Sequence, residues 1–276
     1  MSIVLDSKKL SENLLTKSTS DRTNVYHIAY APEIKKVYIF CWGCNIRCRG
    51  CLCLKEINCL ALEENLDVVH RDPYLRPPQH PSQLLKLKEI TNILDEVEID
   101  SVLFEGQEPS IDPCLPQICQ YLKDKHNCHI TLNTNGVKIP DLSNIDEVVF
   151  SLKAVTLRLY EDYTQRPIDN LLDNFKEVYQ TPGVKLRAES VFIPGYIGFG
   201  ETDKIARFIA SLDKDIPYRI DAYFESGDNP WRKPTPEEME DIVYLAKKHL
   251  TTITCTQQTK RNLKKEDLMF EVVRLY

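Results

Sequence analysis

Residues 36–51 read KVYIFCWGCNIRCRGC, an apolar, strand-like run followed at once by closely spaced cysteines. The last three, Cys44, Cys48 and Cys51, form a C-x3-C-x2-C pattern. Cysteine thiolates are the usual protein ligands of iron–sulfur clusters. Three thiolates leave one iron of a four-iron cube without a protein ligand. The stretch therefore predicts a cluster with one iron open to a bound molecule, which favours chemistry over simple electron transfer.

Two other uses of these cysteines have to be weighed. A zinc ribbon would pair Cys41 with Cys44 and Cys48 with Cys51, but such pairs are normally separated by about 15–20 residues. Here three residues separate them. A disulfide framework is typical of short secreted chains, whereas this chain is long and lacks the charged-then-apolar layout of an export signal. The iron–sulfur interpretation is favoured over both alternatives.

Composition is that of a soluble globular protein. The 276 residues are enough for one large α/β barrel or two ordinary domains. Hydrophobic residues make up 42% of the chain and charged residues 28%, and no apolar stretch approaches the ~20 residues that span a bilayer. The net charge of −6 disfavours a nucleic-acid partner. We expect a cytoplasmic protein, without a membrane partner, in a cell that keeps these thiols reduced.

Strand-like runs alternate with amphipathic helical segments along the chain. We expect strands at Lys36–Cys41, Ser101–Glu105, His129–Asn133, Glu147–Leu152, Leu186–Ile193 and Tyr218–Phe224, with Thr251–Thr256 as a further candidate. We expect helices at Ser82–Val97, Ile168–Tyr179, Thr202–Leu212, and from a capping box at Thr235 to about His249. This alternation is typical of right-handed βαβ units around a parallel sheet. We therefore predict an α/β fold, a partial (β/α)6 barrel open on one side.

The two segments that break this rhythm suggest the domain organisation. Residues 1–30 are expected to form an N-terminal extension, and residues 31–276 the barrel. The stretch 54–81 contains Pro73, Pro77 and Pro78 among mixed charges and is predicted to be an inserted loop. Loops of this length inside a compact domain are often functional, although a surface insertion without a role is an equal alternative.

Polar and glycine motifs occur where the predicted strands end. They are Gly106, Glu108 and Pro109 after the second strand, Thr134, Asn135 and Gly136 after the third, Ser151 and Lys153 at the fourth, and Ile193-Pro194-Gly195 at the fifth. In parallel barrels the active site forms at the carboxyl ends of the strands. Glu108 can accept from an ammonium group and Lys153 can pair with a carboxylate. Each motif alone is also compatible with an ordinary turn, so their common position carries the prediction.

These motifs together resemble the radical S-adenosylmethionine (SAM) superfamily. The likeness rests on the three cysteines, Gly106-Gln-Glu-Pro109, Thr134-Asn-Gly136 and Ser151-Leu-Lys153. It implies that Cys44, Cys48 and Cys51 bind a [4Fe–4S] cluster whose fourth iron is chelated by SAM. It further implies that Gly106, Glu108 and Pro109 hold the methionyl amino group, and that Asn135, Ser151 and Lys153 meet the ribose and carboxylate.

Within the superfamily the chain is most similar to the glycyl-radical-enzyme activases of the pyruvate formate-lyase activating type. The softer matches that carry this likeness are residues 151–164, Phe192-Ile-Pro-Gly-Tyr196 and residues 232–239. The resemblance implies an oxygen-sensitive enzyme that cleaves SAM to a 5′-deoxyadenosyl radical, which abstracts hydrogen. It also implies an external one-electron reductant, a flavodoxin or ferredoxin, and a glycyl radical enzyme as partner.

The chain departs from the family pattern at several positions. The residue before the last cluster cysteine is usually aromatic and packs on the adenine, and here it is Gly50. Acidic residues usual before Thr-Asn-Gly and at the start of the Asp-x-Lys motif are replaced by Asn133 and Ser151. A Tyr-His pair near the sixth strand reads Tyr223-Phe224. The SAM site is consequently better supported than the activase role.

The remaining cysteines divide into two groups. Cys41, Cys53 and Cys59 surround the cluster motif, where they could ligate a second cluster, contact substrate or be ordinary loop thiols; Cys53 is the candidate catalytic hydrogen donor. Four lie in apolar patterns and are expected to be small core residues: Cys114, Cys119, Cys128 and Cys255.

Two kinds of alternative to the activase remain open. A radical SAM enzyme could instead modify a small molecule, a peptide or RNA, the last being disfavoured by the charge balance. A protein of a different class, an iron–sulfur electron carrier, would need a fourth protein ligand, for which Cys41 is the candidate. The carrier leaves the other strand-end motifs without explanation.

Overall fold

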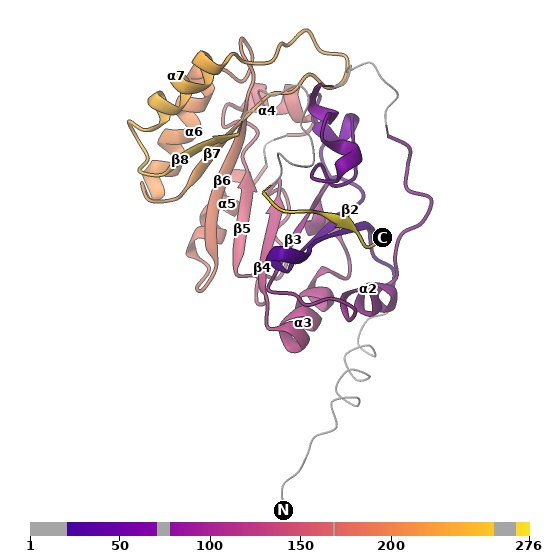
Figure 1. Ribbon diagram of the computed structural model, residues 1–276. Coiled ribbons are helices and arrows are strands. Elements are labelled where there is room, and N and C mark those ends of the chain that lie inside the picture. The colour runs from indigo at the N-terminus through magenta and orange to yellow at the C-terminus, as the bar shows by residue number, and fades with distance from the viewer. Residues whose placement is uncertain (1–20, 71–77, 168, 257–268) are drawn as a thin grey trace, which may run out of the picture.

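One curved sheet organises the part of the chain that the computed structural model describes, residues 21–70, 78–167, 169–256 and 269–276 (Figure 1). The nine strands seen there are β1 (Val25–Ala31), β2 (Lys36–Cys41), β3 (Ser101–Gly106), β4 (His129–Thr134), β5 (Glu147–Ser151), β6 (Lys185–Phe192), β7 (Tyr218–Ala222), β8 (Ile253–Thr256) and β9 (Val273–Arg274). Their order is β8-β7-β6-β5-β4-β3-β2-β1-β9.

The sheet confirms the predicted partial barrel. Strands β2 to β8 pair in parallel, each with its successor. The six strands expected from the sequence are β2 to β7, and the further candidate at residues 251–256 forms β8. The first and last strands in the order, β8 and β9, do not pair with each other, so the barrel stays open.

The helices connect successive strands. They are α2 (Leu87–Leu94), α3 (Leu115–His126), α4 (Leu157–Thr164), α5 (Leu171–Gln180), α6 (Phe199–Leu212) and α7 (Pro236–Ala246). Single 3-10 turns lie at Pro32–Ile34, Leu52–Leu54, Glu63–Asn65, Val68–His70 and Pro109–Ile111. The capping box predicted for α7 is present, because the Thr235 hydroxyl accepts from the Glu238 amide and the Glu238 carboxylate accepts from the Thr235 amide. Helices α3 and α4 were not expected from the sequence.

Helix α2 is shorter than the predicted Ser82–Val97. Its first residues are extended because Lys86 bridges to Arg22 and the Thr23 hydroxyl donates to the Leu85 carbonyl, 2.5 Å away. The chain that leads into β1 thus takes the backbone partners that a longer helix would use. None of the helices in the described residues is long and apolar enough to cross a membrane.

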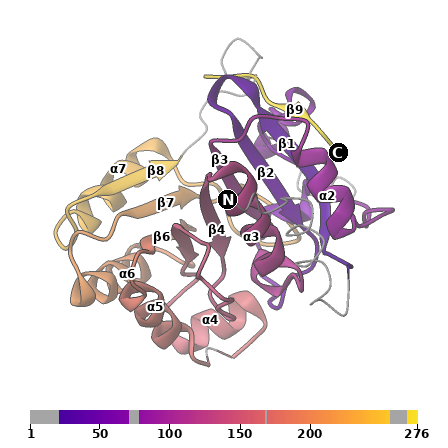
Figure 2. The ribbon, with the colours of Figure 1, turned by 90° about the horizontal axis from the view of Figure 1, so that it is seen from below.

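The main core lies between the convex face of the sheet and the helices (Figure 2). Alternate strand residues such as Phe104, Phe150 and Ile220 point into it and are fully buried. Because side chains alternate across a strand, the residues between them face the concave side. That inner face is where a barrel of this kind can hold a ligand.

Parts of the predicted N-terminal extension and of the predicted inserted loop pack against the sheet. Val25–Ala31, which the sequence analysis placed in an N-terminal extension, forms the fully buried strand β1, antiparallel to β2. In the predicted insertion, Ile57, Cys59 and Leu62 are buried against the concave side of β1 and β2, and the Tyr26 hydroxyl donates to the Ile57 carbonyl. Residues 1–20 and 71–77 of these segments lie outside the described residues.

Candidate active site

The structure brings the predicted motifs to one edge of the sheet. The neighbouring parallel strands β2, β3, β4 and β5 end, in this order, at the cysteine loop, Gly106–Pro109, Thr134–Gly136 and Ser151–Lys153. The carboxyl ends of parallel strands share an edge, which Figure 1 shows beside α4. Residues more than 100 positions apart in the chain therefore contribute to a single site.

The cysteine loop is held in place by backbone atoms of other elements. The amides of Arg47 and Arg49 donate to the Thr164 and Tyr163 carbonyls, at 2.8 and 2.9 Å. These carbonyls belong to the last turn of α4, where a helix leaves acceptors unused. The Asn229 side chain donates to the Arg49 carbonyl at 2.8 Å. A loop that would otherwise be free is thus fixed before any ligand binds.

The three predicted cluster ligands are accessible on this loop. Cys44 is exposed, and Cys48 and Cys51 are half-buried. Although Cys44 as a residue is exposed, protein surrounds its sulfur atom and that of Cys48, and this loss of hydration raises their pKa values to about 11 and about 12. A hydrogen bond with the Cys53 thiol lowers the pKa of Cys51 to about 6. The positive charge of Lys153 lowers all three. Thiols lose their protons when they bind a metal, and a buried cation beside them favours that state.

Glu108 lies beneath the site and ties two loops together. Its side chain is fully buried. The carboxylate accepts from the Thr134 hydroxyl at 2.6 Å, the Asn135 amide at 2.7 Å and the Ser110 amide at 3.1 Å. Burial raises its pKa and these hydrogen bonds oppose the rise. The structure therefore places the Glu108 carboxylate against the Thr-Asn-Gly turn, with both oxygens already bonded.

The Thr-Asn-Gly turn meets the cysteine loop directly. The Asn135 side-chain amide donates to Asn45 Oδ1 at 2.7 Å and lies 3.4 Å from Cys44 Sγ. Gly136 has φ +75°, and a Cβ there would lie 1.8 Å from Phe150 Cζ. Only glycine fits this position, because the turn packs directly against the Phe150 ring.

The Gly106–Pro109 segment also contains a glycine that no other residue can replace without a clash. Gly106 has φ +100°, and a Cβ would lie 2.9 Å from the Cys41 backbone nitrogen and oxygen. The Gln107 side chain accepts from the Gly43 amide at 2.9 Å, which fixes the start of the cysteine loop. Pro109 is buried and opens a 3-10 turn. The contact made by Gln107 was not predicted, although the residue stands within the motif.

Lys153 completes the predicted set. Its ammonium group donates to the Ser151 hydroxyl. Burial lowers its pKa, but Cys48, Glu189 and the other thiols outweigh burial and raise it overall. The lysine is therefore a persistent positive charge that lies close to the cysteine loop.

Aromatic rings fill the space beside Gly50. A Cβ on Gly50 would lie 2.8 Å from Tyr223 and 3.3 Å from both Trp231 and the Tyr163 hydroxyl. Trp231 stacks on Tyr196 with ring centroids 4.1 Å apart. The sequence analysis noted a missing aromatic side chain at position 50 but not the rings that occupy its place.

The other cysteines near the motif lie in different surroundings. Cys41 points into the helix-side core, where burial and the charges of Asp112, Glu108 and Cys119 raise its pKa. Cys59 is buried beneath the inserted segment. The Cys53 thiol donates to the Gly106 carbonyl, 3.7 Å away, so its catalytic role stays a prediction at the edge of the site.

The core assignment holds for three of the four remaining cysteines. Cys114, Cys119 and Cys128 are buried in the main core. Cys255 is exposed, and the prediction for it was wrong. It lies on β8, the last strand at one end of the sheet, so it has a neighbouring strand on one side only.

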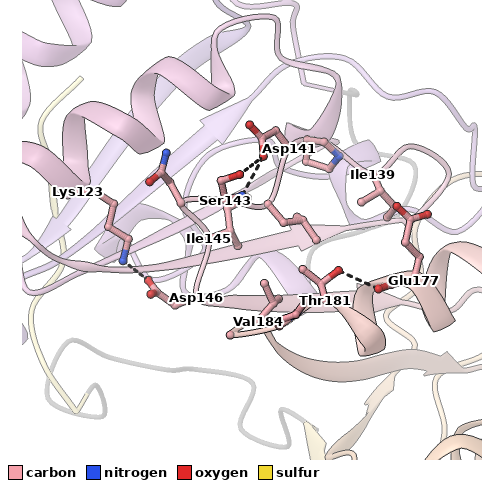
Figure 3. A pocket seen from close by; sticks show the side chains of 14 residues that line it. Lys123, Ile139, Asp141, Ser143, Ile145, Asp146, Glu177, Thr181 and Val184 are labelled. Carbon is pink, nitrogen blue, oxygen red and sulfur yellow. Dashed lines mark hydrogen bonds and ion pairs between the residues drawn. The ribbon is translucent and has the colours of Figure 1, made fainter.

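A hollow at the opposite edge of the sheet contains none of these residues. It lies among the residues that precede β5 and β6 (Figure 3). Three of its charged groups bond to the protein itself: Lys123 pairs with Asp146 at 2.5 Å, and Asp141 accepts from the Ser143 amide and hydroxyl. This hollow carries no functional assignment.

The comparison with protein families decides the class. The sequence profile of the radical SAM superfamily matches residues 38–212, from β2 to the end of α6. The chain belongs to the radical SAM superfamily. It is accordingly an enzyme of that superfamily, and the electron-carrier alternative is wrong.

Individual relatives agree with this membership. A Methanocaldococcus jannaschii protein, provisionally named a glycyl-radical enzyme activating enzyme, is 23% identical over 269 residues, 95% of each chain. Streptococcus suis SuiB bound to its precursor peptide SuiA superposes with a TM-score of 0.56 at 14% identity, over 78% of this chain and 47% of that one. A radical SAM methyltransferase from Sphaerobacter thermophilus gives a TM-score of 0.51 at 12% identity, over 94% and 83%. At these identities the structures support the fold.

Superfamily membership implies a [4Fe–4S] cluster and SAM, and the residues fit both. In the part of the chain that the structure describes, no three His, Cys, Asp or Glu side chains stand close enough to hold a single metal ion. The ligands of a cluster bind separate irons and can stand further apart. A loop with three accessible thiols, a lysine beside it, and two glycines that expose the backbone match a cluster with a small zwitterionic ligand.

Proposed function

We propose that the protein cleaves SAM reductively and that the resulting radical abstracts a hydrogen atom from a glycine of a partner enzyme. The observation that carries the proposal is the contact of the Thr-Asn-Gly turn with the cysteine loop, Asn135 Nδ2 lying 3.4 Å from Cys44 Sγ. A SAM-loaded [4Fe–4S] cluster supplies methionine and a 5′-deoxyadenosyl radical on one-electron reduction. The residues of this chain bind the cluster and SAM, orient SAM and shield the site from water.

The proposed roles of these residues follow their positions. Cys44, Cys48 and Cys51 would hold three irons, and the backbone of Gly106 to Pro109 would receive the methionyl ammonium group. Asn135, Ser151 and Lys153 would bind the ribose and carboxylate, and Lys153 has the charge for the latter. In this proposal Glu108 acts through the turn that it holds, together with Thr134, because its carboxylate is already bonded.

SAM cleavage is tested with the anaerobically reconstituted protein. After dithionite reduction, chromatography should detect 5′-deoxyadenosine from added SAM. Cys48→Ser should abolish product and cluster together, whereas Cys59→Ser, at a buried thiol away from the loop, should retain both. A wild-type protein with a full cluster that releases no 5′-deoxyadenosine would contradict the proposal.

The second part of the proposal is that the partner is a glycyl radical enzyme. It is supported by the Methanocaldococcus jannaschii relative, which matches 95% of the chain. Mixing the reduced protein, SAM and a candidate glycyl radical enzyme should give the electron paramagnetic resonance doublet of a glycyl radical. A flavodoxin or ferredoxin should replace dithionite as the electron donor. Release of 5′-deoxyadenosine without that signal, for every candidate, would favour an enzyme that modifies a small molecule, peptide or RNA.

We also place the protein in a reducing, oxygen-poor cytoplasm. Its ten cysteines include the accessible thiols of the proposed cluster loop. Exposed thiolates and their clusters persist only where oxidants are scarce. Aerobic purification should therefore yield protein with little iron, and anaerobic purification protein with substantially more.

A further inference from the structure

The side chain of Asn135 reaches the sulfur of a proposed cluster ligand. Its Nδ2 atom lies 3.4 Å from Cys44 Sγ and 2.7 Å from Asn45 Oδ1, so each of the two amide hydrogens has an acceptor. Asn135 is buried, and little water therefore competes for these hydrogens. A side chain that follows β4 thus bonds to the cysteine loop that follows β2.

A neighbouring backbone group fixes the orientation of this amide. The Asn135 Oδ1 atom accepts from the Val137 amide at 3.0 Å, and a backbone N–H can only donate. The oxygen of the side chain must therefore face Val137, which turns the NH2 group toward Cys44. A flipped amide would set two donors, its own NH2 group and the Val137 N–H, against each other.

The turn that carries Asn135 is also held from two other sides. The backbone amide of Asn135 donates to the buried Glu108 carboxylate at 2.7 Å. From α5, the Asn174 side chain donates to the Gly136 carbonyl at 2.8 Å. The amide that faces Cys44 is therefore in place before a cluster binds. A preorganised donor of this kind stabilises developing negative charge without first having to reorient.

Iron binding leaves the Cys44 sulfur as an acceptor only. In the free thiol, Sγ can donate to Asn45 Oδ1, 4.0 Å away, but a metal-bound cysteine has lost its proton. The Asn135 amide then donates to a sulfur that shares the negative charge of the cluster, and such charge-assisted hydrogen bonds are stronger than neutral ones. Hydrogen bonds to the sulfurs are among the factors that set the reduction potential of a cluster. Because reduction adds a negative charge, a donor at this sulfur stabilises the reduced cluster more than the oxidised one.

We propose that Asn135 raises the reduction potential of the [4Fe–4S] cluster through an N–H···S hydrogen bond to Cys44, and thereby eases the one-electron reduction that SAM cleavage needs. The proposal rests on the proposed function, in which Cys44 is a cluster ligand. It is compatible with the SAM contact assigned to Asn135 there. Both amide hydrogens are engaged by protein, but Oδ1 keeps one lone pair, which can accept from a ribose hydroxyl.

The test measures the midpoint potential of the cluster without SAM. The anaerobically reconstituted protein is titrated with dithionite in the presence of redox mediators, and the electron paramagnetic resonance signal of the reduced cluster is recorded. At a fixed potential, Asn135→Ala should lower the ratio of reduced to oxidised cluster about tenfold, which is a fall in midpoint potential of about 59 mV for a one-electron couple.

Asn174→Ala is the matched control. It removes the hydrogen bonds that hold the same turn through the Gly136 and Val137 carbonyls but leaves the amide that faces Cys44. The ratio of reduced to oxidised cluster should stay within about twofold of the wild type. Equal shifts in Asn135→Ala and Asn174→Ala would show that loosening of the turn, and not the hydrogen bond, changes the potential. A shift of less than about twofold in Asn135→Ala would overturn the proposal as well.

A second measurement decides the question if Asn135→Ala does not retain its cluster. Protein labelled with ¹⁵N in the asparagine side chains is reduced and studied by pulsed electron paramagnetic resonance. A ¹⁵N coupling to the cluster is expected, and it should persist in Asn45→Asp, which has no side-chain nitrogen at that position. Absence of the coupling in labelled Asn45→Asp would overturn the proposal. Because SAM is absent from both measurements, such a failure leaves the 5′-deoxyadenosine and glycyl-radical tests of the function standing.

Discussion

Replacing Glu108 with glutamine should weaken the hydrogen bonds that hold the Thr134–Gly136 turn at the site. In the wild type one carboxylate oxygen accepts from the Thr134 hydroxyl and the Ser110 amide, and the other accepts from the Asn135 amide. In Glu108→Gln the amide oxygen can keep the first pair, but its NH2 group then faces the Asn135 N–H. One charge-assisted hydrogen bond is lost, worth about 1.5–3 kcal/mol, and buried donors are left unsatisfied at about 1–3 kcal/mol.

Relief of the buried charge offsets part of this loss, because burial already raises the pKa of Glu108. We therefore expect Glu108→Gln to reduce the free energy of unfolding by about 3 kcal/mol, which corresponds to a fall in Tm of roughly 6–12 °C for a chain of this size. Circular dichroism melting of the reduced, metal-free protein measures the shift. Glu240→Gln on α7 is the matched control.

The same variant should also bind SAM more weakly after reconstitution, since Asn135 is no longer anchored. Equilibrium dialysis with labelled SAM tests this second effect. A fall in Tm of less than about 2 °C, together with unchanged SAM binding, would show that the Glu108 carboxylate does not hold the turn.

Three further predictions follow from local geometry. Gly136→Ala places a Cβ 1.8 Å from Phe150 Cζ at a φ of +75°, so we expect a loss of roughly 2–5 kcal/mol of stability by urea unfolding. Asn229→Ala removes the hydrogen bond to the Arg49 carbonyl and should speed iron loss to a chelator several-fold, because about 1 kcal/mol of loop anchoring is lost. Glu105 has its pKa raised to about 7 by burial, so the folded state binds the extra proton and stability should fall by up to about 3 kcal/mol as pH rises from about 4.5 to 7.

Matched control variants distinguish these specific effects from a general loss of stability. Gly183→Ala has a similar φ of +82° with nothing within 4 Å of the added Cβ, so it should cost about 1–2 kcal/mol; a loss equal to that of Gly136→Ala would contradict the steric argument. Asn144→Ala removes a comparable side-chain hydrogen bond far from the loop and should not change iron release. Glu105→Gln should flatten the difference in stability between pH 4.5 and 7, and an unchanged pH profile would rule out Glu105 as its source.

The fold could be predicted because its signals are local. Each of the strands β2 to β7 is a short run rich in β-branched and aromatic residues. The start of α7 can be predicted from the capping box of Thr235 and Glu238 alone. The strand β1 could not be recognised in this way. Its burial depends on pairing with β2 on one side and with β9, from the end of the chain, on the other.

The candidate site could be predicted only as a set of positions. The sequence indicated which residues stand at the strand ends, but it did not reveal what each side chain contacts. Glu108 looks like a free ligand in the sequence, and the structure shows both of its oxygens bonded to neighbouring loops. Glu105 appears in the sequence as the last residue of an apolar strand, and its inward direction depends on the curvature of the sheet.

Gly50 shows how a departure from a family pattern can be compensated in space. Judged by the sequence alone, the absence of an aromatic side chain before Cys51 weakens the case for a SAM site. In the structure, Tyr163 from α4 and Tyr223 and Trp231 from the segment after β7 already occupy the space that a side chain at position 50 would need. Since a Cβ would lie 2.8 Å from the Tyr223 ring, glycine is required here by rings more than 100 residues away. A motif position is therefore best judged by the volume around it, and by that measure the aromatic surface beside the cysteine loop is present.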